Sequence, residues 1–224
     1  MNQDYRKLME TEPELFRNSR ELGEVYILTD PDEIRAVEEK LHRETGIVYE
    51  DEYIRLVRDA VIFPDMSRGT YIRILPRRPE SAVAVLPVLN GKILLLRHFR
   101  HSLRKWMWEI PRGFGEYGIT AAENAEKELR EETGITGAKL EYLGKICPDS
   151  GMSADQVSVF LARFSPECHL EKQDEKEAVK EYRMVSREDL KAMTEAGNLE
   201  DGFTLSAIAL ACLRGKLEEK RSDR

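Results

Sequence analysis

Hydrophobic residues in the first third of the chain change from helical spacing to the runs typical of strands. In residues 1–45, apolar side chains recur at helical spacing after Asp30 and Pro31, which predicts one short amphipathic helix. Residues 47–75 instead contain β-favouring runs interrupted by turn residues. A connector at residues 77–79 separates this part from the remaining two thirds of the chain.

The second part of the chain begins with a hairpin signal. Two apolar runs, residues 82–89 and 92–99, are separated by Asn90-Gly91, a dipeptide that favours a two-residue hairpin turn. The later segments read as strand, helix, two strands, charged loop, strand and two helices, at residues 106–110, 120–133, 140–146, 156–164, 171–181, 182–185, 187–196 and 203–217. This order predicts an α+β fold.

Charge and composition narrow the classes of function. The net charge of −7, from 35 basic against 42 acidic residues, disfavours a dedicated duplex-binding protein, although a small nucleotide needs only a local basic pocket. Three widely spaced cysteines form no disulfide framework. The polar N-terminus lacks the apolar region of a signal peptide, and residues 82–89 are too short to cross a membrane. We expect a cytoplasmic protein with no membrane partner.

One helix carries the candidate chemistry. It follows a glycine-rich loop at residues 113–118, where glycine permits close approach to a ligand. Thr120 stands three residues before Glu123, the spacing of a capping box, and Gly134 is placed to end the helix. The apolar stripe expected to dock this helix consists of Ala122, Ala125 and Leu129.

Three carboxylates share one face of this helix. Glu128 and Glu132 are four residues apart and lie one above the other, and Glu131 borders the same face. Like charges at this spacing repel, and a divalent cation on which their oxygens converge would remove the repulsion. Carboxylate oxygens suit Mg²⁺, a hard cation. A solvated acidic helix face is the alternative interpretation.

The segment resembles the Nudix box, whose pattern is G-x5-E-x7-R-E-U-x-E-E-x-G-U, with U a bulky aliphatic residue. The matching positions, without a gap, are Gly113, Glu128, Leu129, Glu131, Glu132, Gly134 and Ile135. The wider resemblance covers approximately residues 80–217. It implies a Nudix-type α/β/α sandwich with a mixed β-sheet in residues 79–224, preceded by an N-terminal α+β extension in residues 1–78.

Two positions depart from the family pattern. Ile119 replaces the first glutamate of the box, and Lys127 replaces its arginine. In the family these two residues help to brace the loop against the helix, so their joint loss resembles a compensated change. Glu116 or Glu123 is the candidate to supply the missing carboxylate as the partner of Lys127.

The resemblance implies a metal-dependent hydrolysis of a phosphoanhydride. Glu128, Glu131 and Glu132, with the backbone carbonyl of Arg112, would hold Mg²⁺, for which Mn²⁺ is a possible substitute. Such an ion neutralises the charge of a diphosphate and lowers the pKa of a bound water.

The general base is expected from an acidic loop, as in relatives that cleave ADP-ribose. Glu177 is the first candidate and Glu175 the second, with Glu131 of the box as a rival. Residues 147–153 resemble the turn at the edge of the substrate pocket in that group.

The residues before the box are expected to bind the substrate. Arg100 and Arg112 are candidates to pair with phosphate oxygens, and Glu109 to accept hydrogen bonds from a base or ribose.

The leading hypothesis is a pyrophosphatase of ADP-ribose or another nucleotide sugar, giving a nucleoside monophosphate and a sugar phosphate. A hydrolase of nucleoside triphosphates or dinucleoside polyphosphates is the second, and a non-catalytic nucleotide-sensing module the third. By analogy with related enzymes, the N-terminal strands are expected to build a homodimer.

Overall fold

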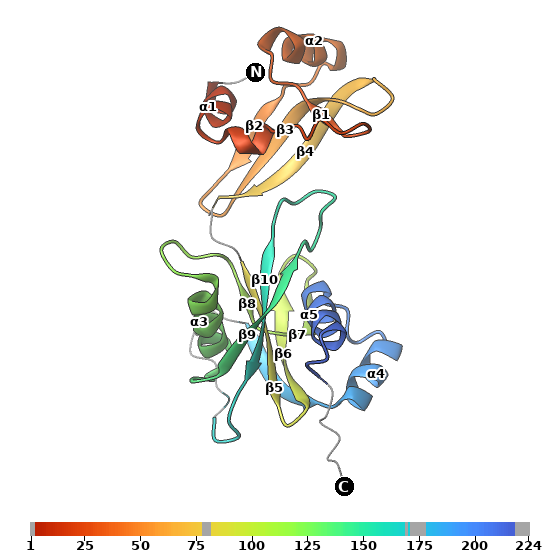
Figure 1. Cartoon of the computed structure of the whole chain (residues 1–224). Helices are drawn as coiled ribbons and strands as arrows, with labels where there is room; N and C mark the ends of the chain where they lie inside the picture. The colour runs from red at the N-terminus through yellow and green to blue at the C-terminus, as the bar shows by residue number, and fades with distance from the viewer. Residues whose placement is uncertain (1–2, 78–81, 169, 171–177, 218–224) are drawn as a thin grey trace. The chain divides into compact units, whose positions relative to one another are not determined.

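The computed structural model describes residues 3–77, 82–168, 170 and 178–217. The chain divides into two compact units. Unit 1 comprises residues 1–77 and 149–155, and unit 2 comprises residues 78–148 and 156–224. Each unit has its own sheet and core (Figure 1).

Unit 1 is a small antiparallel sheet covered by helices. Its elements are α1 (Gln3–Thr11), the 3-10 helix η1 (Pro13–Phe16), β1 (Tyr26–Ile27), α2 (Pro31–Leu41), β2 (Gly46–Glu50), β3 (Ile54–Ile62) and β4 (Arg68–Pro76). Strand β3 pairs with β1, β2 and β4. The predicted helix after Asp30 is confirmed, since the Asp30 side chain accepts hydrogen bonds from the backbone N–H groups of Asp32 and Glu33. The elements α1, η1 and β1 were not predicted from the sequence.

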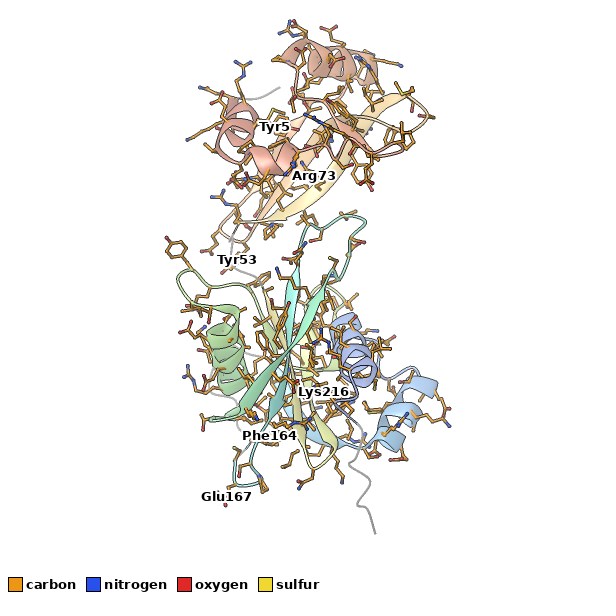
Figure 2. All side chains as sticks on the ribbon, viewed as in Figure 1. Tyr5, Tyr53, Arg73, Phe164, Glu167 and Lys216 are labelled. Carbon is orange, nitrogen blue, oxygen red and sulfur yellow. The ribbon has the colours of Figure 1, made fainter. Side chains whose placement is uncertain are left out.

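A buried charge network lies in the core of unit 1. The Asp59 carboxylate is 1% exposed and accepts a hydrogen bond of 2.6 Å from the Tyr5 hydroxyl of α1. Arg73 of β4 donates to both oxygens of the same carboxylate, at 2.5 and 3.1 Å, and to the Leu15 carbonyl at 2.9 Å. Figure 2 labels Tyr5 and Arg73 in this unit. Burial, and next the charge of Asp59, raises the pKa of Tyr5. The network therefore ties α1 and η1 to the sheet.

The segment of residues 149–155 belongs to unit 1, although it interrupts unit 2 in the sequence. The Ile74 N–H donates to the Met152 carbonyl at 2.8 Å, and the Ala154 N–H donates to the Ile74 carbonyl at 2.9 Å. These bonds extend the edge at β4 by one short bridge. The turn that the sequence analysis placed at the pocket edge thus supplies backbone partners to β4.

Unit 2 contains a mixed sheet between two layers of helices. Its elements are β5 (Val83–Leu89), β6 (Lys92–Arg100), β7 (Lys105–Glu109), β8 (Arg112–Gly113), α3 (Ala121–Thr133), β9 (Lys139–Ile146), β10 (Val157–Arg163), β11 (Val179–Val185), α4 (Arg187–Glu195) and α5 (Gly202–Leu213). The strand order is β11-β6-β5-β10-β9, with β7 beside β6 and β8 beside β5. Strands β5 and β10 are parallel and the other pairs antiparallel, so the predicted mixed sheet is confirmed.

The hairpin between β5 and β6 turns at Asn90 and Gly91, as predicted. Both residues have positive φ, 50° and 74°, which matches the twist of the flanking strands. This short connection places β6 against β5 at the start of unit 2.

The two faces of the unit 2 sheet bury different sets of side chains. Val83 and Val85 share one core cluster with Leu129 of α3. The alternate residues of β5 share the other cluster with Ala207 and Ala211 of α5. Helix α3 therefore covers one face and α5 the other (Figure 1), which confirms the α/β/α sandwich.

Two details of the helices differ from expectation. Ala122 was expected to dock α3 but is exposed, while Ala121 packs against the core cluster on that face. Helix α5 ends at Leu213, before the predicted end at residue 217. Among the described residues, no helix has the length and apolar character needed to cross a membrane.

Candidate active site

Helix α3 begins and ends as the local sequence predicts. The Thr120 hydroxyl oxygen accepts from the Glu123 N–H at 3.2 Å, and the Glu123 carboxylate accepts from the Thr120 N–H at 2.7 Å. Gly134 caps the other end with φ of 75°, in the left-handed region that glycine adopts readily. The hydrogen bonds from Thr120 lower the pKa of Glu123. Glu123 is therefore committed to the cap.

Glu116 is the carboxylate that pairs with Lys127. The Lys127 ammonium lies 2.9 Å from a Glu116 oxygen and 3.2 Å from a Glu131 oxygen. The hydrogen bond to Glu116, and then that to Glu131, raises the pKa of Lys127 against the effect of burial. Of the two candidate partners, Glu116 and Glu123, the structure places Glu116 beside Lys127. This ion pair joins the glycine-rich loop to the helix three residues before Ile119, where the family has its glutamate.

Gly113 makes room for the carboxylate of Glu128. A Cβ atom added at Gly113 would lie 2.0 Å from Cδ of Glu128, which is less than any van der Waals contact allows. Strand β8 holds this backbone by pairing with β5. Asn124, buried on α3, donates to the Phe114 carbonyl at 2.8 Å. The loop and the helix are thereby held together, with a carboxylate pressed against the loop backbone.

Glu131 and Glu132 lie in different surroundings. Glu132 is only 2% exposed. Burial lowers the pKa of Arg112, and the charge of Glu132 opposes this lowering slightly. Glu131 is about one-third exposed and contacts Lys127. The hydroxyl of Tyr182 on β11 donates to the Glu132 carbonyl at 2.7 Å, which anchors the end of α3 to the sheet.

The three box carboxylates are not gathered around one point. Within residues 3–77, 82–168, 170 and 178–217, no group of three or more His, Cys, Asp or Glu side chains is arranged to hold a metal ion. The convergence expected from the sequence is thus absent from these side-chain positions. Glu131 lies beside Lys127, and like charges at this helical spacing repel one another. The donor chemistry itself, three carboxylates beside a backbone turn, suits a hard divalent cation.

Glu109 is buried under a cluster of cationic and imidazole groups. It is 0% exposed and accepts two hydrogen bonds from Arg100, of which that from Nε measures 2.7 Å. His98 Nδ1 lies 3.1 Å away and Arg112 Nη2 3.6 Å away. Burial alone would raise the pKa of Glu109, but the bonds from His98 and Arg100 and the nearby positive charges lower it. The carboxylate is therefore ionised and faces protein groups.

The Arg112 side chain points toward the start of α5. Its Nη2 lies 3.4 Å from Asp201 Oδ1, and its guanidinium carbon lies 4.0 Å from the ring centroid of Phe203. Burial, followed by the charge of Arg100, lowers the pKa of Arg112 against the attraction of Asp201 and Glu109. Asp201 and Phe203 were not predicted as site residues, because the local sequence indicates only that a helix begins there.

The two expected loop bases, Glu175 and Glu177, lie outside the described residues. The adjoining strand β11 begins at Val179 and pairs with β6. On that strand Glu181 lies 2.8 Å from Arg97 as an exposed ion pair. The structure therefore brings together Arg100, Glu109 and Arg112, and separately Gly113 with Glu128, while the loop bases stay a prediction.

Known proteins resemble this chain in sequence and in fold. The model of the NUDIX domain matches residues 78–203. The ADP-ribose pyrophosphatase of Bacillus subtilis (strain 168) is 32% identical over 142 residues, which cover 63% of this chain and 77% of that protein. The methanol dehydrogenase activator of Bacillus methanolicus is 29% identical over 178 residues, covering 79% and 94%.

A further relative and a solved structure agree with these matches. The ADP-sugar pyrophosphatase of Mus musculus is 28% identical over 116 residues, covering 48% of this chain and 53% of the relative. A crystal structure described as an ADP compounds hydrolase superposes with a TM-score of 0.67 at 18% identity, covering 88% of this chain and all of that one. At this identity the superposition establishes the fold alone.

Proposed function

The chain belongs to the Nudix domain family, and from that premise we propose that it hydrolyses the pyrophosphate bond of ADP-ribose or a similar nucleotide sugar. Water adds to one phosphorus, the bridging P–O bond breaks, and the products are a nucleoside monophosphate and a sugar phosphate. The names of the Bacillus subtilis and mouse relatives support the substrate class. The homodimer, which rests on analogy with related enzymes, and the cytoplasmic location expected from the sequence belong to the same proposal.

The contact of Glu128 with Gly113 is the observation that carries this proposal. It brings a carboxylate of the box against the backbone of the turn that contains the Arg112 carbonyl. Glu128, Glu131 and Glu132 with that carbonyl would hold Mg²⁺, or Mn²⁺ in its place. The bound ion supplies neutralisation of the diphosphate charge and a water of lowered pKa. Lys127, which lies 3.2 Å from a Glu131 oxygen, would compete with the ion for this carboxylate.

The remaining residues bind and orient the substrate. Arg100 is held by Glu109 through two hydrogen bonds and keeps about a quarter of its side chain exposed, so it is the candidate to pair with a phosphate oxygen. Because Glu109 is fully buried among its partners, we assign it the orientation of Arg100 in place of the direct contact with base or ribose expected from the sequence. The proton of the attacking water passes to a carboxylate, for which Glu177, Glu175 and Glu131 are the candidates.

A substrate panel tests the proposal. ADP-ribose, UDP-glucose, GDP-mannose and nucleoside triphosphates are each incubated with the chain, with and without Mg²⁺, and the nucleoside monophosphate formed is separated by anion-exchange chromatography and quantified by its absorbance. We expect turnover of ADP-ribose that requires Mg²⁺ and exceeds that of the triphosphates. Preferred cleavage of triphosphates would favour the second function, and absence of turnover on every substrate would favour a nucleotide-sensing module.

A chelator distinguishes a catalytic from a structural role of the metal. Treatment with EDTA should abolish turnover and leave the thermal unfolding midpoint unchanged, because each described unit has a core of apolar side chains. Unfolding on chelation would indicate a structural metal instead.

A further inference from the structure

The first turn of α5 contacts the segment just before Gly113 through three different groups. Asp201 lies 3.4 Å from the Arg112 guanidinium, and the Phe203 ring lies under the same guanidinium at 4.0 Å. The Thr204 hydroxyl oxygen accepts from the Ile110 N–H at 3.0 Å. An ion pair, an aromatic contact and a hydrogen bond to the backbone therefore fix one short stretch of chain.

Asp201 divides its two oxygens between the helix and this segment. Its Oδ2 accepts from the Thr204 N–H at 2.8 Å and from the Thr204 hydroxyl at 2.7 Å, which caps α5. Its Oδ1 faces Arg112. Most capping residues lie at the protein surface, but Asp201 is only 5% exposed and Thr204 is fully buried. A buried charge is costly unless it is paired, so Arg112 is the partner that makes this cap possible.

The segment of residues 109–113 also contacts a residue of the candidate metal site. Arg112 and Gly113 pair with β5 as strand β8, and Gly113 meets the Glu128 carboxylate. Glu109, three residues before Arg112, orients Arg100. The backbone between Glu109 and Gly113 is thus held by the sheet on one side and by the start of α5 on the other.

We propose that Asp201 is a positioning residue for the metal site and acts through the Arg112 side chain. By holding the guanidinium, it fixes the backbone of residues 112–113 beside Glu128, so that the Arg112 carbonyl and the Glu128 carboxylate are set for one cation. This rests on the proposed function only in its assumption that these groups bind the metal. Residues that support metal ligands from behind typically change affinity by about 10- to 100-fold when altered.

Substitution of Asp201→Asn tests the proposal without removing the cap. Asparagine caps helices about as well as aspartate, so α5 should form, while the charge facing Arg112 is lost. We expect Mn²⁺ binding to the metal-free full chain, measured by calorimetry without substrate, to weaken about tenfold. In ADP-ribose turnover, kcat at fixed Mg²⁺ should fall while KM changes less than about twofold, because the altered group does not contact the substrate.

Glu200→Gln is the matched control. Glu200 precedes Asp201 directly, is exposed, and pairs with Lys105 at 2.5 Å. Its variant should bind Mn²⁺ as the unaltered chain does. Equal weakening in both variants would overturn the proposal, because the effect would then follow from net charge near the site.

An Arg112→Met background separates positioning from general stability. If Asp201 acts through Arg112, adding Asp201→Asn to Arg112→Met should weaken Mn²⁺ binding no further. Full additivity of the two losses, or wild-type Mn²⁺ affinity in Asp201→Asn, would overturn the proposal. Should Asp201→Asn fail to fold, Phe203→Leu removes the aromatic face under Arg112 and is measured in the same way, with the same tenfold expectation.

Failure of the proposed function has a different signature. A chain that binds Mn²⁺ with the predicted dependence on Asp201 but cleaves no nucleotide sugar would refute the substrate assignment and support the positioning role. A chain that binds no Mn²⁺ at all would overturn the positioning role directly.

Discussion

Each unit of the molecule contains a buried carboxylate that accepts two hydrogen bonds from one arginine, and the two networks differ in which residues they contact further. In unit 1, Asp59 accepts from Arg73 and from Tyr5, and the remaining Arg73 bond goes to the Leu15 carbonyl. The contacts described for this network end within its own core. It ties α1 and η1 to the sheet of unit 1.

In unit 2, Glu109 likewise accepts two hydrogen bonds from one arginine, but its contacts continue. Nη2 of Arg112 approaches both Glu109 and Asp201. The backbone of Arg112 leads directly to Gly113 and so to Glu128. A buried carboxylate bonded to an arginine therefore stabilises the fold where its further contacts end in the core, and orients a site where its further contacts reach candidate ligands.

The network of Asp59, Arg73 and Tyr5 in unit 1 should make the larger contribution to the free energy of unfolding. Asp59→Asn leaves the Arg73 charge without its buried counter-ion, so the free energy of unfolding should fall by about 3 kcal/mol. Urea denaturation of the full chain measures this. Glu33→Gln is the control, because Glu33 pairs with Arg68 at the surface of the same unit and should cost less than about 1 kcal/mol. Equal effects of the two variants would contradict the distinction, as would a loss of kcat in folded Asp59→Asn.

The catalytic carboxylates should show the opposite pattern, with a loss of rate and little loss of structure. Glu132→Gln keeps the size of a buried side chain but loses the charge proposed to hold the metal, so kcat should fall about 100-fold. Steady-state turnover at saturating Mg²⁺ measures this, and circular dichroism checks the fold. Glu126→Gln, on the exposed side of α3, should retain full activity. Wild-type turnover of Glu132→Gln would remove that residue from the mechanism.

Local signals explain why some elements of unit 2 were predicted correctly. The capping box of Thr120, the terminal Gly134 and the Asn90-Gly91 turn each depend on residues close in sequence, so the sequence alone determines them. Ala122 was assigned wrongly because helical spacing defines a stripe only to within one residue of the docked face. The angle at which α3 packs on the sheet decides that Ala121 is covered instead.

Long-range contacts explain what the sequence did not predict at the site. The spacing of the glutamates puts Glu128 and Glu132 on one face, but the packing of Glu128 on Gly113 depends on strand β8, which is too short to leave a pattern. The clamp of Arg112 by Asp201 joins residues far apart in the chain. Burial of Glu109 likewise depends on the pairing of β7 with β6, whose register places Glu109 opposite Leu96.

The network of Glu109 should also be visible in the pH dependence of stability. Its folded pKa lies below the ordinary value of 4.5, so its contribution is present above that pH and is lost as the pH falls through the folded pKa. Glu109→Gln should lower the free energy of unfolding by about 2 kcal/mol at pH 7. This loss is smaller than that expected for Asp59→Asn, because Arg112 still has Asp201 as a counter-ion.

Unfolding curves between pH 7 and pH 3 measure this effect. The difference between the original chain and Glu109→Gln should shrink below pH 4.5. Glu181→Gln, which removes an exposed pair with Arg97, is the control and should give a small difference at every pH. A gap between the original chain and Glu109→Gln that is constant over the whole range would show that Glu109 contributes by packing and not by charge.

The smallest expected effect concerns Lys127, which forms an ion pair with Glu131 in the described structure. Lys127→Met removes this competitor, so Mn²⁺ affinity should rise about threefold, the equivalent of one exposed ion pair, while the metal-free chain loses about 0.5 kcal/mol of stability. Calorimetric titration and thermal unfolding measure the two quantities. Lys191→Met, which breaks an exposed pair with Glu195 on α4, should cost similar stability without changing the affinity. Weaker Mn²⁺ binding in Lys127→Met would mean that Lys127, through Glu116, supports the ligands more than it competes for them.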